Sequence, residues 1–120
     1  NQLKGKVKSI NGENCIVTTD SGDDVHALKI NVKNNGDGSL VSLRPERVAI
    51  NSSENFENNF DAKVKELIYL GDHIRSRVEV CGNDQFIVKI PNSYKEANLK
   101  EGATVKLSWK ASDSRALDLN

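Results

Sequence analysis

Two cysteines and two histidines are the residues of this chain best suited to nucleophilic or metal chemistry. Cys15 and Cys81 lie in strand-like segments with no Cys or His at the spacing of a metal site, which predicts reduced, half-buried thiols. His26 and His73 are far apart in the sequence and have no nearby carboxylate array, which favours solvated strand histidines over ligands. No Ser occupies a nucleophile-elbow sequence. The sequence therefore predicts no catalytic residue and no metal site.

Two glycine-containing segments have residues that could suggest phosphate or calcium binding. A P-loop ends in Gly-Lys-Ser/Thr, but Gly5-Lys6 is followed by Val7 and no Gly-rich loop precedes it. Gly36-Asp37-Gly38 lacks the third glycine and the following helix of a dinucleotide site. The oxygen-rich loop from Asn34 lacks the acidic ligand that a calcium loop has at its twelfth position. We expect ordinary turns here, no ATPase machinery and no bound cofactor.

Composition argues against a nucleic-acid or membrane ligand. The 120 residues carry 17 basic and 17 acidic side chains and the pI is 6.9, so no overall field attracts a polyanion. The aromatic residues are few, and Phe60, Phe86 and Trp109 fall on faces expected to point inward, which favours core packing over base stacking. No apolar run approaches the roughly 20 residues that span a bilayer. We expect no nucleic-acid partner and a soluble chain.

The first residues and the lack of Met indicate whether this chain is a whole protein or part of a longer one. The first five residues lack the apolar core of a signal peptide, and the chain contains no Met. The interpretation drawn from this composition is an excised piece of a longer chain.

Period-two alternation of apolar and polar residues predicts an all-β chain. One example is the segment 74–81, in which Ile74, Ser76, Val78 and Val80 share one face. Gly, Asn and Asp clusters separate the segments. A single helical turn is expected at 93–99. The predicted strands cover 3–9, 15–19, 25–30, 39–43, 60–65, 67–70, 74–81, 86–90 and 103–110, with a last short one around 115–117.

The alternation repeats, which predicts two related halves. Gly38, Val41 and Leu43 align with Gly102, Val105 and Leu107 at a constant offset, and Val7 aligns with Val64 at a shorter one. The predicted organisation is a first half at 1–50, a connector at 51–59 and a second half at 60–120. Short strands with hairpin turns indicate two small Greek-key barrels or sandwiches of the oligonucleotide/oligosaccharide-binding (OB) type. Because each half alone has little core, we expect the halves either to exchange strands or to pack together.

Two short segments are predicted to shape the surface. Arg44-Pro45-Glu46 ends a strand, because Pro45 cannot donate to a ladder, and its opposite charges are expected to tie the corner to neighbouring groups. Tyr69-Leu70-Gly71 is expected to form a bend that shapes a contact surface. Both are structural or interface roles.

These motifs together resemble the TOBE region at the C-terminus of ATP-binding subunits of bacterial ABC importers, especially the spermidine/putrescine branch. The resemblance covers essentially the whole chain. It is carried by Val41-Ser42-Leu43-Arg44-Pro45-Glu46, Tyr69-Leu70-Gly71, Val78-Glu79-Val80, Ile90-Pro91-Asn92 and Gly102-x-x-Val105-x-Leu107-x-Trp109 followed by Asp113 and Ala116-Leu117, with Asn1-x-Leu3-x-Gly5 at the start.

The resemblance implies a non-catalytic domain of a transport ATPase. ATP and Mg would bind in a preceding domain, and this one would contribute to a homodimer of ATPase subunits attached to membrane-spanning permeases at the cytoplasmic face. In some relatives such a domain receives a regulatory protein or a small ligand. The alternative from the fold type alone is a free-standing OB-type module that binds a ligand or nucleic acid.

Overall fold

The computed structural model describes residues 1–91 and 99–119. The described residues form ten strands and two single-turn 3-10 helices, in agreement with the predicted all-β class; the expected helical turn at 93–99 lies almost wholly outside them. The elements are β1 (Gln2–Asn11), β2 (Asn14–Thr19), β3 (Asp24–Lys29), β4 (Gly38–Leu43), η1 (Pro45–Arg47), β5 (Ala49–Ile50), β6 (Asn58–Tyr69), β7 (His73–Val80), β8 (Asn83–Pro91), β9 (Thr104–Trp109), η2 (Ala111–Asp113) and β10 (Ser114–Asp118).

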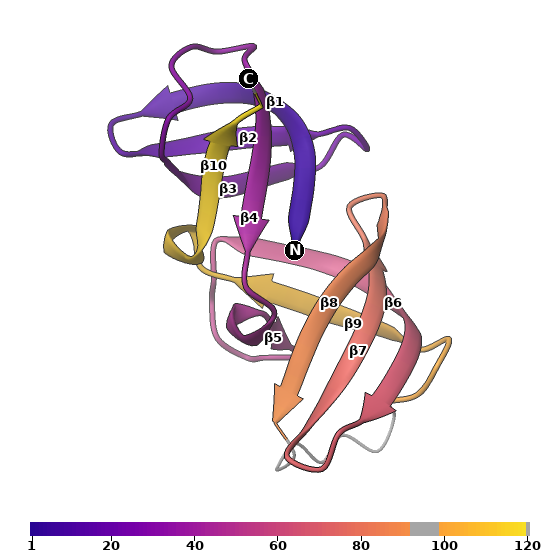
Figure 1. The fold of residues 1–120 in the computed structure, drawn as a ribbon. Coiled ribbons are helices and arrows are strands. Elements are labelled where there is room, and N and C mark those ends of the chain that lie inside the picture. Colours follow the sequence, from indigo (N-terminus) through magenta and orange to yellow (C-terminus); the bar gives the residue numbers. More distant parts are fainter. Residues whose placement is uncertain (92–98, 120) are drawn as a thin grey trace.

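The strands build two five-stranded units that lie one above the other in Figure 1. The first unit is a closed barrel with the order β1-β2-β3-β10-β4, in which β10 pairs antiparallel with β4 and parallel with β3. The second unit is a sheet with the order β5-β9-β6-β7-β8. In this sheet β6, β7, β8 and β9 neighbour one another as β1, β2, β3 and β4 do in the barrel. The strand β5 takes the place of β10. The predicted pair of small OB-like units is confirmed.

The two units are internal repeats, and their alignment differs by two residues from the predicted one. In β1, Val7 N donates to Asp37 O, and Val7 O accepts from Gly36 N; in β6, Val64 bonds to Ala103 and Gly102 in the same way. Gly102 therefore matches Gly36, and both have a positive φ, of 86° and 90°. Aligning Gly102 with Gly38 was wrong because a shift of two keeps every strand residue on its face, so alternation cannot detect it.

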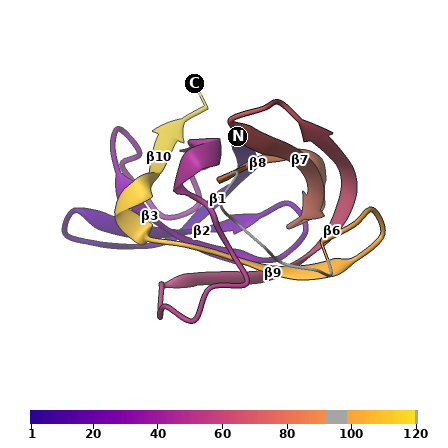
Figure 2. The same ribbon diagram turned by 90° about the horizontal axis from the view of Figure 1, so that it is seen from below.

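The two repeats exchange their last strands, as expected. After η1 the chain enters β5, which pairs with β9 in the second sheet, and after η2 it enters β10, which joins the first barrel. Figure 2 shows the second crossing, from β9 through η2 into β10. Residues 49–50, assigned to the first half, therefore lie in the second sheet, and the stretch 60–120 ends in the first barrel.

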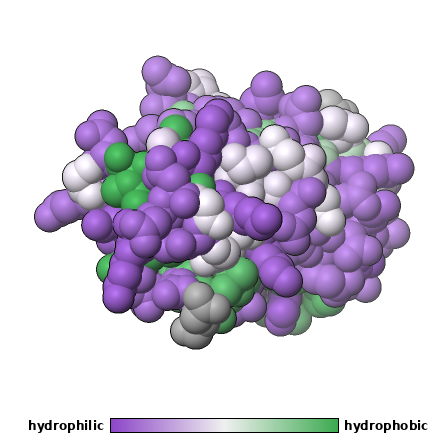
Figure 3. Space-filling model, turned by 90° about the horizontal axis from the view of Figure 1, so that it is seen from above, coloured by the Kyte–Doolittle hydropathy of each residue, from purple (hydrophilic) through white to green (hydrophobic). Residues whose placement is uncertain are grey.

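The apolar faces of both units form one continuous hydrophobic core. Phe86 and Trp109 are fully buried as predicted, and Phe60 is half-buried with its ring centroid 5.4 Å from that of Trp109. The outer surface above the first barrel is mainly hydrophilic, with separate small hydrophobic patches (Figure 3). Within residues 1–91 and 99–119, no helix has the length and apolar character needed to cross a membrane.

An ion pair on the first barrel gives a pH-dependent stability. Asp24 accepts hydrogen bonds from Lys8 Nζ and Thr18 Oγ1, both 2.7 Å long, and these hold the pKa of Asp24 below its ordinary value. A lowered folded-state pKa stabilises the protein above the unfolded pKa of about 3.9, and this stabilisation is lost as the pH falls through the folded value. We expect the unfolding free energy of Asp24→Asn to depend less on pH below about 4 than that of the parent chain.

Urea titrations from pH 2.5 to 6 measure this effect, and Asp20→Asn, at the end of the neighbouring strand, is the control. An Asp24→Asn variant that loses stability with acid as steeply as the parent would contradict the assignment.

Candidate functional site at the crossover between the barrels

The Arg44-Pro45-Glu46 corner is where the chain first crosses between the two OB-like barrels, of which only the first is closed. Arg44 is extended (φ −76°, ψ 138°), Pro45 opens the 3-10 turn, and Arg47 N donates to Arg44 O at 3.0 Å. Pro suits this position because its fixed φ fits a helical turn and its missing N–H would have no partner there. Lys110 and η2 repeat this conformation at the second crossing. The structure thus places a tight turn where the sequence indicated one.

The charged groups of this corner differ from the expected pattern. Arg44 and Glu46 are exposed, and in the part of the chain that the structure describes neither side chain makes a hydrogen bond or ion pair. The contact across the crossing is instead made by Arg47, whose Nε lies 4.0 Å from Asp113 Oδ1. These two residues are the last in η1 and η2, so the pair joins equivalent positions of the two repeats. The Arg47 side chain is 59% exposed, so the pair adds little stability.

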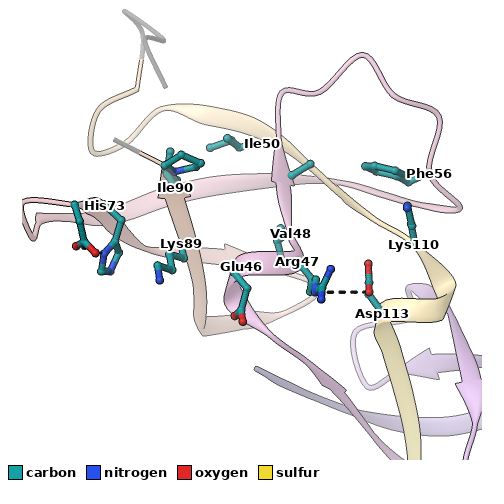
Figure 4. A pocket seen from close by; sticks show the side chains of 13 residues that line it. Glu46, Arg47, Val48, Ile50, Phe56, His73, Lys89, Ile90, Lys110 and Asp113 are labelled. Atoms are coloured by element: carbon teal, nitrogen blue, oxygen red, sulfur yellow. Dashed lines mark hydrogen bonds and ion pairs between the residues drawn. The ribbon is translucent and has the colours of Figure 1, made fainter. Parts of the chain in front are cut away.

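A cleft of about 590 Å³ opens beside η1 (Figure 4). Its walls include the apolar side chains of Val48, which follows η1, of Ile50 in β5 and of Ile90 in β8. Polar and charged groups border the cleft at both ends, with His73 and Lys89 at one and Arg47, Lys110 and Asp113 at the other. An apolar centre between charged ends suits a small organic ligand with separated polar groups.

Two local interactions organise the ends of this cleft. Asp72 Oδ1 and His73 Nδ1 are 2.7 Å apart, and the hydrogen bond from His73 lowers the pKa of Asp72 below its ordinary value. At the other end, Lys110 Nζ lies 5.9 Å from the centroid of the Phe56 ring, within cation–π range. In the described residues no three His, Cys, Asp or Glu side chains come together to hold a metal ion.

The Tyr69-Leu70-Gly71 bend is the exposed tip of the β6–β7 hairpin. Tyr69 is 69% exposed and Leu70 is 48% exposed, and Leu70 N donates to His73 O at 2.9 Å to close the hairpin. Gly71 has a φ of 85°, a conformation that favours glycine. The tip itself does not line the cleft, but the adjoining Asp72 and His73 do. Its role as a contact surface remains a prediction.

Two asparagines join the barrels: Asn1, which the sequence indicated only as the start of a family segment, and Asn58, which was placed in the connector. Asn58 Oδ1 accepts a hydrogen bond from His26 N at 2.8 Å, and Asn58 Nδ2 donates one to His26 O at 2.9 Å. The Asn58 side chain therefore bonds to both backbone groups of one residue of β3, as the backbone of a neighbouring strand would. Asn1 does the same to Ile87 in β8, at 2.7 and 2.6 Å. The repeat alignment makes Asn1 and Asn58 equivalent, so the clamps are reciprocal. The motif Asn-x-Leu/Phe-x-Gly/Ala-x-Val, which begins at both, was a detectable signal.

The β7–β8 turn forms a further bridge to the first barrel. Asn83 Nδ2 donates to Gln2 O at 2.9 Å. Cys81 and Gly82 both have a positive φ, of 51° and 75°, as a tight two-residue hairpin requires. Burial, with a smaller contribution from Asp23, raises the pKa of the Cys81 thiol to about 12. The thiol is therefore protonated at neutral pH and a poor nucleophile.

The space around Gly82 shows how closely this turn approaches the first barrel. A Cβ on Gly82 would lie 2.7 Å from Ser21 Cβ, whereas a Cβ on Gly12, with a similar φ of 64°, would have no neighbour within 4 Å. Both Ala substitutions incur a backbone cost of about 1–2 kcal/mol. We expect Gly82→Ala to lose about 1 kcal/mol more than Gly12→Ala in chemical denaturation, because the turn must also shift. Equal losses would show that the bridge does not constrain the turn.

The comparisons with known proteins agree with this architecture. Residues 41–117 match the TOBE domain family model. The spermidine/putrescine import ATP-binding protein PotA of Trichodesmium erythraeum is 32% identical over 101 residues, which cover 78% of this chain and 26% of that protein. The PotA of Pseudomonas aeruginosa (strain UCBPP-PA14) is 27% identical over 115 residues, 92% of this chain and 32% of that protein. The chain thus spans between a quarter and a third of these relatives.

A solved structure shows the same fold over nearly the whole chain. The cytoplasmic molybdate-binding protein ModG, with molybdate bound, superposes with a TM-score of 0.81 at 18% identity, over 98% of this chain and 95% of that one. At this identity the likeness establishes the fold. The family match covers well over half of the chain and includes both crossovers. The chain therefore belongs to the TOBE domain family.

Proposed function

We propose that this chain is the C-terminal accessory domain of the ATP-binding subunit of an ABC importer for polyamines or similar small solutes. The observation that carries the proposal is the similarity to PotA proteins, which extends over 92% of the chain in the Pseudomonas relative. The chain carries no P-loop sequence, so it would contribute no catalysis itself. ATP and Mg would bind to the preceding domain of the parent subunit.

Within such a subunit the domain would act in assembly and regulation at the cytoplasmic face of the membrane. It would contact its counterpart in a homodimer of ATPase subunits, and the parent would attach to the membrane-spanning permeases. The exposed Tyr69-Leu70-Gly71 tip is our candidate for a contact surface. The cleft beside η1 is where a small regulatory ligand would fit.

The proposal is tested with the complete gene product. We expect the reading frame upstream of Asn1 to encode an ATPase domain, and the full-length subunit with its permeases to drive ATP-dependent spermidine uptake into proteoliposomes. Deletion of the 120 residues described here should lower uptake, and the isolated chain should bind no ATP. A gene without an ATPase domain, or ATP binding by the isolated chain, would contradict the proposal.

Self-association is tested separately on the isolated chain. We expect sedimentation equilibrium to show weak, concentration-dependent dimerisation, because the exposed apolar contact at Tyr69 and Leu70 is small. Tyr69→Ser should reduce it, while Arg77→Gln, on the neighbouring strand, should not. A chain that stays monomeric at the highest attainable concentration would argue against the dimerisation role.

The second candidate is a free-standing ligand-binding or nucleic-acid-binding module. It is favoured by the match to ModG, which accounts for 95% of that chain without an attached ATPase domain. Titration with labelled oligonucleotides at two salt concentrations separates the candidates, because binding to phosphates weakens steeply with salt. We expect no such binding, given equal numbers of basic and acidic residues.

A further inference from the structure

A second hollow, of about 310 Å³, lies at the crossover and is rich in arginine. Ser42 and Arg115 are directly opposite each other on the antiparallel strands β4 and β10. Their neighbours Leu43 and Ser114 are buried, so this pair faces outward. Arg44 continues the outward row in extended conformation. The lining consists of three arginines, two serines and one aspartate: Ser42, Arg44, Arg47, Ser112, Asp113 and Arg115.

The charges in this hollow are unbalanced. Three guanidinium groups share one carboxylate, which leaves a net charge of +2. Asp113 is 4.0 Å from Arg47. The Arg44 and Arg115 side chains make no hydrogen bond or ion pair within the part of the chain that the structure describes. Three arginine side chains that line one hollow repel each other, so this arrangement is electrostatically unfavourable without a counter-anion.

We propose that this hollow binds a phosphoryl-class dianion, either free or carried by a small molecule. A phosphate group carries a charge of about −1.5 to −2 at neutral pH and has several strong acceptor oxygens, which matches the net charge of +2. Arg44 and Arg115 supply planar donor pairs suited to bidentate recognition of such oxygens. The hydroxyls of Ser42 and Ser112 donate further hydrogen bonds. A single carboxylate would leave half of the charge uncompensated.

The backbone around this site is held in place before any ligand binds. Ser42 and Arg115 are fixed by the register of β4 and β10. The start of β10 is anchored by the buried Trp109, whose Nε1 donates to Ser114 Oγ at 2.6 Å. Each 3-10 turn is closed by a backbone hydrogen bond, from Arg47 N to Arg44 O and from Asp113 N to Lys110 O, both 3.0 Å long. Binding therefore orders only the arginine side chains and no backbone, which keeps its entropic cost low.

Titration with inorganic phosphate tests the proposal. We expect saturable changes of the amide resonances around Ser42, Ser112 and Arg115 in heteronuclear NMR at pH 7.5. Arg115→Gln and Arg44→Gln should each weaken binding about tenfold or more, because each removes a charge-assisted hydrogen bond. Arg75→Gln, an exposed arginine of β7 outside the hollow, is the matched control and should leave binding unchanged. Circular dichroism and the thermal midpoint verify that the variants remain folded.

Two further experiments identify the charge and the chemical class of the ligand. Binding should weaken between pH 7.5 and 5, because phosphate gains its second proton at a pKa of about 6 to 7 while arginine stays charged. Sodium acetate at equal ionic strength should produce no saturable change at these residues. The proposal is overturned if phosphate gives no saturable response, if Arg115→Gln binds it as the parent does, or if acetate binds equally well.

Discussion

Asn58→Asp is expected to destabilise the chain by about 2–4 kcal/mol, although the two side chains have nearly the same shape. Asn58 is only 1% exposed and bonds to both backbone groups of His26. Aspartate can still accept from His26 N, but it has no N–H to donate to His26 O, so two oxygens face each other. A charge at this depth also loses its hydration.

The measurement is the unfolding free energy from urea titration at pH 7, with the m-value checked for a two-state transition. Asn59→Asp is the matched control, since the neighbouring Asn59 is exposed and its Nδ2 donates to Phe56 O in the preceding loop. We expect that control to stay within about 0.5 kcal/mol of the parent. If both variants lose the same amount, the clamp does not hold the barrels together.

Trp109→Ala is expected to cost about 3–5 kcal/mol, the usual range for a large aromatic side chain removed from a core. Trp109 is fully buried, and its ring centroid lies 5.4 Å from that of Phe60 and 5.8 Å from that of Phe86. Its indole also donates to Ser114 Oγ at 2.6 Å, across the second crossover. The substitution would leave a cavity in one barrel and a buried hydroxyl without its donor in the other.

Trp109→Phe separates these two contributions in part, because it keeps an aromatic ring in the core while it removes the donor and some of the indole volume. We expect it to lose about 1–3 kcal/mol, with the remainder of the Ala effect due to packing. Tyr69→Ala, an aromatic truncation at an exposed site, should change the unfolding free energy by less than about 0.5 kcal/mol. A Trp109→Ala chain as stable as Tyr69→Ala would place Trp109 outside the core.

Much of the fold could be predicted because alternation reports which face of a strand is buried. The inward row Ile74, Ser76, Val78 and Val80 is buried as predicted, and so are Phe86 and Trp109. The turn at Pro45 was also visible, since proline constrains the backbone locally. The partners of the charged side chains around Pro45 could not be predicted. The contact between η1 and η2 joins Arg47 and Asp113, which are 66 positions apart in the sequence. Side-chain partners across such a distance leave no local pattern.

The sequence by itself determined the class of fold, the presence of a repeat and the family resemblance, because these depend on residue type and short spacing. Only the tertiary structure decided which barrel each final strand joins, and therefore which residues surround the crossover. Asn58 appeared to belong to a polar connector, yet it is buried because β3 of the other repeat offers it a free N–H and C=O. That partner lies 32 residues away in the sequence, so it reaches Asn58 only when the two repeats are packed together.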